Sequence, residues 1–293
     1  MDSLRTQLQA SVRFIRAIPF LFTSFMLLTS CTPMAQMQHL CTGCTPLTLS
    51  SPLSPIYGWA RNMSASNRAV AGPAQALHIY IENDGAAYLS PNQIAANPSL
   101  RANLLVLRLM QLDNQSSLYL TRPCYGFAVN AMPATCDARY WTSARYSQEV
   151  VHALSQAIDQ AKIKLNKTAA KIVLIGHSGG GSLALLITLA RTDVETVVTL
   201  AGNLDTDAWV KLHGYGPLDQ SLNPAHQPLL PATVQRWHFA GAADINIPPP
   251  LIVPSCQRDR LARCEILPGV SHQTGWLEHW PQLLARISAS DKP

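Results

Sequence analysis

The 293-residue sequence predicts an α/β domain in which a mostly parallel central sheet carries helices on both faces. Short apolar runs alternate with helix-like stretches along most of the chain, and strands that alternate with helices form parallel sheets. The composition agrees, because 47% of the residues are hydrophobic and only 13% are charged. A chain of this length and apolar content can fill a sizeable core, which argues against intrinsic disorder. The low charge, with 21 prolines and 15 glycines, excludes a coiled coil.

The expected elements follow one another from residue 77 onward. The apolar runs at residues 77–81 and 104–110 are expected strands, and residues 147–167 are an expected helix. Apolar residues from Val150 to Leu165 recur there at intervals of three and four, which gives one buried stripe. The remaining elements are expected at residues 171–175 (strand), 182–190 (helix), 194–201 (strand), 234–240 (strand) and 263–267 (strand).

The N-terminal residues 1–30 have the features of a secretory signal peptide. A basic stretch precedes an apolar run of about fourteen residues, which is shorter than a bilayer span of roughly 20 residues. The run ends at Leu28-Thr-Ser-Cys31, which resembles the lipobox of bacterial lipoproteins, whose cysteine is acylated. The resemblance implies an exported, periplasm-facing membrane lipoprotein anchored through Cys31, in the outer rather than the inner membrane because Thr32 follows. An ordinary signal peptide cleaved nearby is the alternative.

The remainder of the chain is expected to divide into a tether and one folded domain. Residues 31–56 are rich in Pro, Ser and Thr without sustained periodicity, which is typical of a tether behind a lipid anchor. The folded domain is expected to occupy residues 57–293, since no internal repeat or break in composition divides it.

Six cysteines follow Cys31, and an even number in an exported chain indicates disulfides. A zinc site is the alternative for Cys41-Thr-Gly-Cys44, but no second CxxC or paired histidine lies at finger-like spacing. The simplest pairing joins neighbours in the sequence: Cys41 with Cys44, Cys124 with Cys136, and Cys256 with Cys264.

The segment Gly176-His-Ser-Gly-Gly180 is a GxSxG sequence between an expected strand and an expected helix. This context is the strand, sharp turn and helix of a nucleophile elbow. Ser178 is expected at the apex of the turn, and the N–H of Gly179 is expected at the helix N-terminus, where it can stabilise negative charge. A glycine-rich helix start with a capping serine is the alternative.

A serine hydroxyl needs a base and an acid to act as a nucleophile. Asp244 follows the expected strand at 234–240, and His272 follows the expected strand at 263–267. Each therefore lies at the carboxyl end of a parallel strand, where open α/β sheets bind ligands. In a triad of this order, Asp244 fixes the imidazole tautomer, and His272 takes the Ser178 proton and returns it to the leaving group.

Three further positions are candidates for roles near this site. Asp205 follows the expected strand at 194–201 and is the alternative acid; otherwise it caps a loop. The second oxyanion donor is expected from the turn after residue 81, through the backbone N–H of Asp84 or Gly85. His177 points away from the site if the elbow forms and is expected to pack or to line a pocket wall.

The sequence resembles the α/β-hydrolase superfamily over roughly residues 70–290. More narrowly, it is similar to a group of bacterial hydrolase-like lipoproteins, which usually have glycine in place of Asn83 and often tyrosine in place of His177. The shared segments are Tyr80-Ile-Glu-Asn-Asp-Gly85, Arg122-Pro-Cys-Tyr125, Trp141-Thr142, Arg145-Tyr-Ser147, the elbow, Ala201-Gly-Asn-Leu-Asp205 and Ser271-His-Gln-Thr-Gly-Trp276. The resemblance implies the α/β-hydrolase fold but no particular substrate. Arg122, Trp141 and Arg145 either line the cleft or pack beside it, and packing is the favoured interpretation.

The expected function is hydrolysis of ester-like bonds in a small-molecule or lipid ester, most simply a carboxylic ester, through an acyl-enzyme on Ser178. A catalytically silent lipoprotein used for binding or assembly is one alternative, and a serine peptidase is another. No cofactor or metal is expected, and no HExxH motif indicates a zinc protease. The net charge is only +5 without a Lys/Arg-rich run, so nucleic acid is not an expected partner.

Overall fold

The structure is a computed structural model that describes residues 33–63, 75–99 and 104–290. The predicted signal peptide at residues 1–30 and the predicted lipidation site Cys31 lie outside these ranges. No helix among the described residues combines the length and the apolar character needed to cross a membrane.

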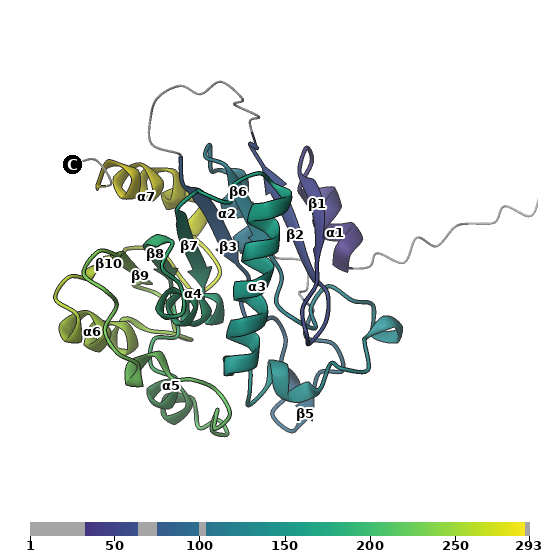
Figure 1. Ribbon diagram of the computed structural model, residues 1–293. Coiled ribbons are helices and arrows are strands. Elements are labelled where there is room, and N and C mark those ends of the chain that lie inside the picture. The colour runs from purple at the N-terminus through teal and green to yellow at the C-terminus, as the bar shows by residue number, and fades with distance from the viewer. Residues whose placement is uncertain (1–32, 64–74, 100–103, 291–293) are drawn as a thin grey trace, which may run out of the picture. The chain divides into compact units, whose positions relative to one another are not determined.

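An eight-stranded sheet forms the centre of the fold, in the order β1-β2-β6-β3-β7-β8-β9-β10 (Figure 1). The strands are β1 (Thr45–Leu49), β2 (Ile56–Arg61), β3 (Leu77–Ile81), β6 (Ser117–Leu120), β7 (Ile172–His177), β8 (Val194–Leu200), β9 (Gln235–Gly241) and β10 (Arg263–Leu267). Strand β2 is antiparallel to β1 and β6, and all other neighbours in the sheet are parallel. A separate hairpin joins β4 (Tyr88–Ser90) and β5 (Gln93–Ile94). The predicted class, α/β with a mostly parallel sheet, is confirmed.

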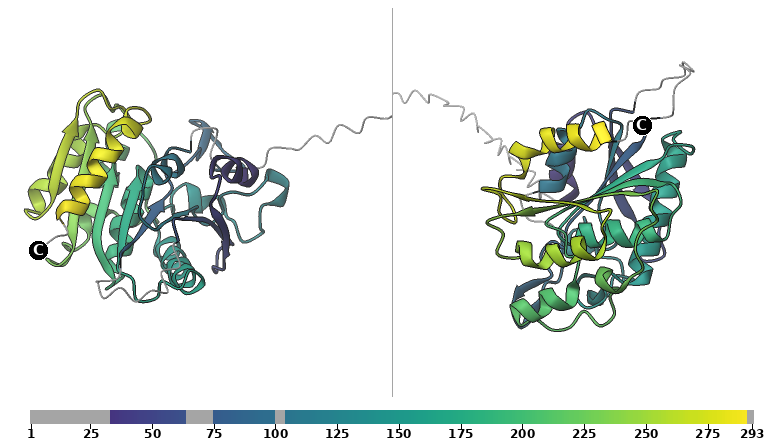
Figure 2. Two further views of the ribbon diagram at one scale, coloured as in Figure 1. Left: turned by 90° about the horizontal axis from the view of Figure 1, so that it is seen from above. Right: turned by 90° about the vertical axis from the view of Figure 1, so that its left-hand side faces the viewer.

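Helices cover both faces of this sheet, as the two views of Figure 2 show. The helices are α1 (Pro33–Leu40), α2 (Leu105–Gln111), α3 (Gln148–Lys164), α4 (Gly179–Leu189), α5 (Thr206–His213), α6 (Pro249–Arg258) and α7 (Trp276–Ser290), with 3-10 turns at Val129–Ala131, Ala138–Trp141 and Pro224–His226. Helices α1, α2 and α7 contribute to one cluster of buried apolar side chains, and α3, α4 and α6 contribute to the other.

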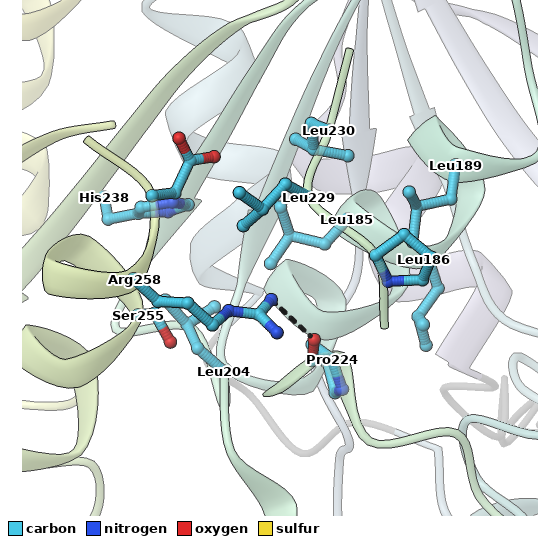
Figure 3. Close-up of a pocket in the computed structure, with 12 residues that line it drawn as sticks. Leu185, Leu186, Leu189, Leu204, Pro224, Leu229, Leu230, His238, Ser255 and Arg258 are labelled. Atoms are coloured by element: carbon cyan, nitrogen blue, oxygen red, sulfur yellow. Dashed lines mark hydrogen bonds between the residues drawn. The ribbon is translucent and has the colours of Figure 1, made fainter. Parts of the chain in front are cut away.

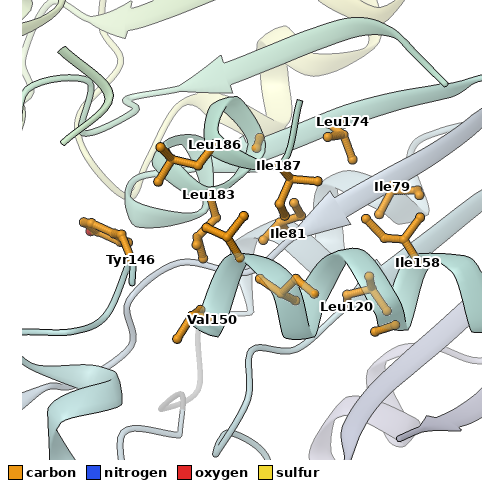
Figure 4. Close-up of a cluster of buried hydrophobic side chains, with 14 of the residues drawn as sticks. Ile79, Ile81, Leu120, Tyr146, Val150, Ile158, Leu174, Leu183, Leu186 and Ile187 are labelled. Atoms are coloured by element: carbon orange, nitrogen blue, oxygen red, sulfur yellow. The ribbon is translucent and has the colours of Figure 1, made fainter. Parts of the chain in front are cut away.

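Alternation along the strands divides the core into these two clusters. In β7, Ile172 and Leu174 join the cluster under α3 and α4, whereas Val173 and Ile175 join the opposite cluster. Figure 4 shows the first cluster, in which the stripe of α3 lies against side chains of β3, β6 and α4. Strands buried on both faces are typical of a parallel sheet.

One predicted strand is wrong. Residues 104–110 lie almost entirely in helix α2, and the strand expected at this stage of the chain is β6 instead. The α2 side chains from Leu105 to Met110 are buried with the exception of Arg108, so the sequence shows a nearly continuous apolar run. Periodicity cannot separate a buried helix from a buried strand in such a run.

The predicted tether is also wrong over its described part, because residues 33–56 belong to the fold. Helix α1 buries Met37, and Gln38 accepts a hydrogen bond of 2.8 Å from the indole N–H of Trp59. Strand β1 pairs with β2 along its whole length, from Thr45 opposite Ala60 to Leu49 opposite Ile56. Prolines are compatible with a strand at the edge of a sheet, so their frequency here does not indicate an unstructured linker.

Candidate active site

Ser178 lies between β7 and α4, where the chain makes the sharp turn that the GxSxG sequence predicts. Its backbone has φ 54° and ψ −123°, a conformation that costs energy for a residue with a side chain. The turn brings Gly176 against the backbone of Gly180, and a Cβ at Gly176 would overlap the Gly180 carbonyl. The tight approach of helix to strand therefore requires glycine at position 176 and holds Ser178 at the apex.

The structure brings the three predicted triad residues together at the carboxyl ends of β7, β9 and β10. His272 Nε2 lies 3.2 Å from Ser178 Oγ, and His272 Nδ1 lies 2.9 Å from Asp244 Oδ2. These distances allow the imidazole to donate from Nδ1 to the carboxylate and to accept the serine hydroxyl proton at Nε2.

The Asp244 carboxylate is oriented by its own loop. Its Oδ1 accepts hydrogen bonds from the N–H groups of Asn246 and Ile247, at 2.8 and 2.9 Å, so Oδ2 is left for His272. Burial by itself would raise the pKa of Asp244, but the hydrogen bonds from His272 and the two N–H groups outweigh it and lower that pKa. The group is therefore an ionised acceptor at neutral pH.

Asp205, the alternative acid, has a structural role. Its Oδ1 accepts hydrogen bonds of 3.1 Å from the N–H groups of Asp207 and Ala208 and caps the N-terminus of α5. It also accepts a hydrogen bond from the Asn223 amide at 3.0 Å. Because Asp244 already accepts from His272, the structure assigns Asp205 to capping.

His177 has a role that the sequence did not reveal. Its Nε2 lies 2.7 Å from the carbonyl oxygen of His272, and its ring is packed against the His272 ring at a centroid distance of 4.8 Å. Burial lowers the pKa of His177 to about 3, so the ring is neutral and donates its Nε2 proton to that carbonyl. The indole N–H of Trp276 donates to the neighbouring Ser271 carbonyl at 2.9 Å. Together these two donors fix the loop that carries His272.

The turn after β3 leaves one backbone donor without an acceptor among the described residues. The N–H of Asn83 donates to Glu82 Oε1 at 2.8 Å, and the N–H of Gly85 donates to Asn83 Oδ1 at 2.9 Å. Gly85, one of the two predicted donors, is therefore already engaged. Among the described residues, the N–H of Asp84 has no such acceptor, and the N–H of Gly179 lies in the first turn of α4, where no helical acceptor exists.

The Asp84 side chain belongs to a buried charged cluster beside the elbow. A Cβ at Gly179 would overlap the Asp84 carboxylate, so the two residues are in direct contact. The carboxylate pairs with Arg122, accepts a hydrogen bond of 2.5 Å from the Tyr146 hydroxyl, and lies 3.3 Å from Arg145 Nη1. Burial alone would raise the pKa of Asp84, but the two guanidinium groups hold it below its usual value.

Arg122, Trp141 and Arg145 were expected either to line the cleft or to pack beside it, and only one of the three lines it. Trp141 is buried and donates to the Ala95 carbonyl at 3.0 Å, and Arg122 is fully buried behind Asp84. Arg145 lines the cleft that contains Ser178 and His272. The preferred interpretation, packing, thus holds for Trp141 and Arg122 and is wrong for Arg145.

The cleft that contains Ser178 and His272 has a volume of about 880 Å³. Its walls come from the turn after β3, the β4–β5 hairpin, the loop before α3, the α5 region, and the loops that carry Asp244 and His272. A second pocket, between α4 and α6, has a volume of only about 40 Å³, enough for roughly one water. Figure 3 shows it, with Arg258 hydrogen-bonded to the Pro224 carbonyl on its wall.

Among the described residues, no group of three or more His, Cys, Asp or Glu side chains could hold a metal ion.

The structure joins the cysteines of the folded part in the three expected pairs. Cys41 with Cys44, Cys124 with Cys136, and Cys256 with Cys264 form disulfides with Cα separations of 5.4, 5.5 and 6.3 Å. These separations are ordinary for disulfides. Because the sulfurs of Cys41 and Cys44 are bonded to each other, this CxxC offers no thiolate to a zinc ion.

No protein-family model matches the sequence, and no curated protein matches it. Solved structures do match. An α/β serine hydrolase without a lid from Xanthomonas campestris is 14% identical with a TM-score of 0.50, over 83% of this chain and 95% of that one. An esterase from Pyrobaculum calidifontis is 12% identical with a TM-score of 0.54, over 88% of each chain.

The chain has the α/β-hydrolase fold. A puromycin-hydrolyzing peptidase from Mycobacterium tuberculosis is similar as well, at 11% identity and a TM-score of 0.54, over 82% of this chain and 37% of that one. Identities this low show the fold alone, so the chemistry of this α/β-hydrolase-fold protein has to be argued from its own residues.

Proposed function

We propose that this protein is a serine hydrolase of carboxylic ester bonds that acts through an acyl-enzyme on Ser178. The observation that carries the proposal is His272, whose two ring nitrogens lie within hydrogen-bond reach of Ser178 Oγ and Asp244 Oδ2. A nucleophile, a base and an orienting acid in this arrangement are what nucleophilic catalysis by serine requires.

The proposed reaction has two halves. Ser178 Oγ attacks the ester carbonyl while His272 Nε2 takes the hydroxyl proton, and the N–H groups of Gly179 and Asp84 donate to the carbonyl oxygen as it becomes negative. The C–O bond to the alcohol then breaks, and His272 gives its proton to the leaving alkoxide. In the second half, water attacks the acyl-enzyme with His272 as base, which releases the acid and restores Ser178.

The resting tautomer of His272 supports this sequence of proton transfers. Ionised Asp244 accepts a hydrogen bond from the Nδ1–H group, so Nε2 carries the lone pair that faces Ser178. The amide of Asn246 also lies 3.0 Å from Nε2, and a donor at that position favours the same tautomer.

The experiment that tests the proposed activity is steady-state hydrolysis of para-nitrophenyl esters by the wild type and three variants. Ser178→Ala and His272→Ala are expected to lose about 10³-fold or more in kcat. Ser143→Ala, which removes another serine of the cleft wall, is expected to keep wild-type activity. Hydrolysis that survives in Ser178→Ala, or falls equally in Ser143→Ala, would contradict the proposal. Cleavage of anilide but not ester substrates would indicate the peptidase alternative.

We also propose that the protein is exported and anchored to a membrane through Cys31. Three disulfides in the folded part support export, because disulfides persist in oxidising compartments. Metabolic labelling with palmitate is expected to mark the wild type and not Cys31→Ser; labelling of both proteins, or of neither, would contradict the anchor.

A further inference from the structure

Arg145 presents a donor to the cleft that no other described residue uses. Its Nε donates to the Thr142 carbonyl at 2.7 Å, and its Nη1 lies 3.3 Å from Asp84 Oδ2. Among the described residues, Nη2 has no hydrogen-bond partner, although the side chain is only 6% exposed. Nη2 is not among the fully buried nitrogens that lack a partner in the described part of the chain. It is therefore partly exposed, and the cleft that Arg145 lines is where it is exposed.

The positive charge of Arg145 is only partly balanced. Asp84 is the one acidic residue among the described residues that line the cleft, and it is shared with Arg122, which makes the closer contact. The next acid behind it is Glu82, and burial raises the pKa of Glu82 to about 7 although Tyr119 and the N–H of Asn83 donate to it. The guanidinium groups of Arg122 and Arg145 thus face one ionised carboxylate, Asp84, and one that is only partly ionised, Glu82. Part of their positive charge is unbalanced, and Arg145 is the one of the two arginines that lines the cleft.

This surplus charge lies close to the nucleophile. The Asp84 carboxylate touches Gly179 on one side and Arg145 on the other, so one carboxylate separates the guanidinium from the elbow. The described neighbour of Arg145 on the side of α5 is neutral, because its guanidinium lies 5.9 Å from the ring centroid of Trp209, which also lines the cleft. Among the described residues that line the cleft, Arg145 is the only arginine or lysine, so an anionic group on a substrate would find its cationic partner here.

We propose that Arg145 is a specificity residue that selects esters whose acyl chain ends in a carboxylate, with Nη2 as the donor to that carboxylate. The inference rests on the proposed function and names the substrate class of the same site. A guanidinium forms strong charge-assisted hydrogen bonds to carboxylates, and a single partly balanced charge matches one negative charge better than the two of a phosphate. Removing the donor leaves the triad, the elbow and the Gly179 N–H in place.

The test compares two para-nitrophenyl esters of equal chain length, the adipate monoester and the hexanoate, which differ by a terminal carboxylate in place of a methyl group. Wild-type protein is expected to show roughly tenfold higher kcat/KM for the adipate monoester, through KM, as one charge-assisted hydrogen bond allows. Arg145→Met is expected to bring the ratio close to one, and Arg145→Lys to keep part of the preference. Lys211→Met removes an exposed charge on α5 and is expected to keep the wild-type ratio.

A purely structural role of Arg145 would lower the turnover of both esters together and leave their ratio unchanged, which would overturn the inference. Equal kcat/KM for the two esters in the wild type would overturn it as well. Calorimetric titration of Ser178→Ala with monomethyl adipate and methyl hexanoate separates this inference from the proposed function, because binding needs no turnover. Tighter binding of monomethyl adipate, lost in the double variant with Arg145→Met, would support anion selection even if neither ester were hydrolysed. Equal binding of the two would refute it.

Discussion

Replacing Asp244 with asparagine tests the triad through the hydrogen bonds of its own loop. Asp244 Oδ1 accepts from the N–H groups of Asn246 and Ile247, and an asparagine oxygen at the same place can keep both bonds. The amide NH₂ of the variant would then occupy the position of Oδ2, 2.9 Å from His272 Nδ1. Two donors cannot share that hydrogen bond, so the imidazole has to carry its proton on Nε2, and the Asn246 amide has to turn its oxygen toward that proton.

In that tautomer, His272 cannot accept the Ser178 proton, because Nε2 is the nitrogen that faces Ser178 Oγ. We expect Asp244→Asn to lower kcat by about 10⁴-fold, which corresponds to about 5 kcal/mol of transition-state stabilisation. KM and the free energy of unfolding are expected to change little, since the loop keeps its backbone hydrogen bonds. The assay is ester hydrolysis under single-turnover conditions, which isolates acylation, together with urea unfolding of the same preparation.

Asp205→Asn is the matched control. The asparagine oxygen can still cap α5, so this variant is expected to remain within about threefold of the wild-type kcat. A larger loss of activity in Asp205→Asn than in Asp244→Asn would refute the assignment of the acid. Full activity in Asp244→Asn would refute the role of the carboxylate altogether.

Three further predictions concern the surroundings of the triad. Because burial raises the pKa of Glu82 from 4.5 to about 7, the folded state holds this proton more tightly than the unfolded state, and the group lowers the free energy of unfolding as the pH rises through that range. Glu82→Gln is therefore expected to become more stable relative to the wild type by about 3 kcal/mol between pH 4.5 and pH 8 in urea unfolding, and a difference that does not vary with pH would contradict this. Asp84→Asn leaves two guanidinium groups without their carboxylate and is expected to cost about 3 kcal/mol of unfolding free energy, whereas an unchanged melting temperature would show that the pairs contribute little. His177→Phe removes the closer of two donors to the His272 carbonyl, the other being the Trp276 indole N–H at 3.2 Å, and is expected to lower kcat roughly tenfold with KM unchanged. Trp276→Phe, which removes the donor that Ser271 and His272 share, is the companion variant, and wild-type kcat in both would show that the loop needs none of these bonds.

The sequence was informative where function depends on local patterns. The GxSxG segment between a strand and a helix predicted the turn at Ser178, and the ends of two later strands predicted where Asp244 and His272 lie. Each prediction needed only residues adjacent in the chain and the rule that parallel strands end at one edge of a sheet. The α/β class with a mostly parallel sheet was predictable for the same reason.

The remainder depends on contacts between residues distant in the sequence. The sequence does not reveal helix α2, which looks like a strand, or strand β1, which looks like a tether. Packing against other elements decides both structures, and the periodicity of the two segments does not show it. The engagement of the Gly85 N–H by Asn83 is a property of a turn geometry that the sequence does not specify. His177 and Arg145 received their roles from partners 95 and 61 residues away, His272 and Asp84.

Intact-mass analysis of the full chain after reaction with a fluorophosphonate tests the central claim most directly, because this probe reacts with a serine only when a base activates it. The account predicts one adduct per chain, located on Ser178 by peptide mapping, present in Ser143→Ala and absent in Ser178→Ala. In His272→Ala, the reaction is expected to be at least 10²-fold slower. No adduct on folded protein with its disulfides intact would contradict an activated nucleophile and would favour a catalytically silent binding protein.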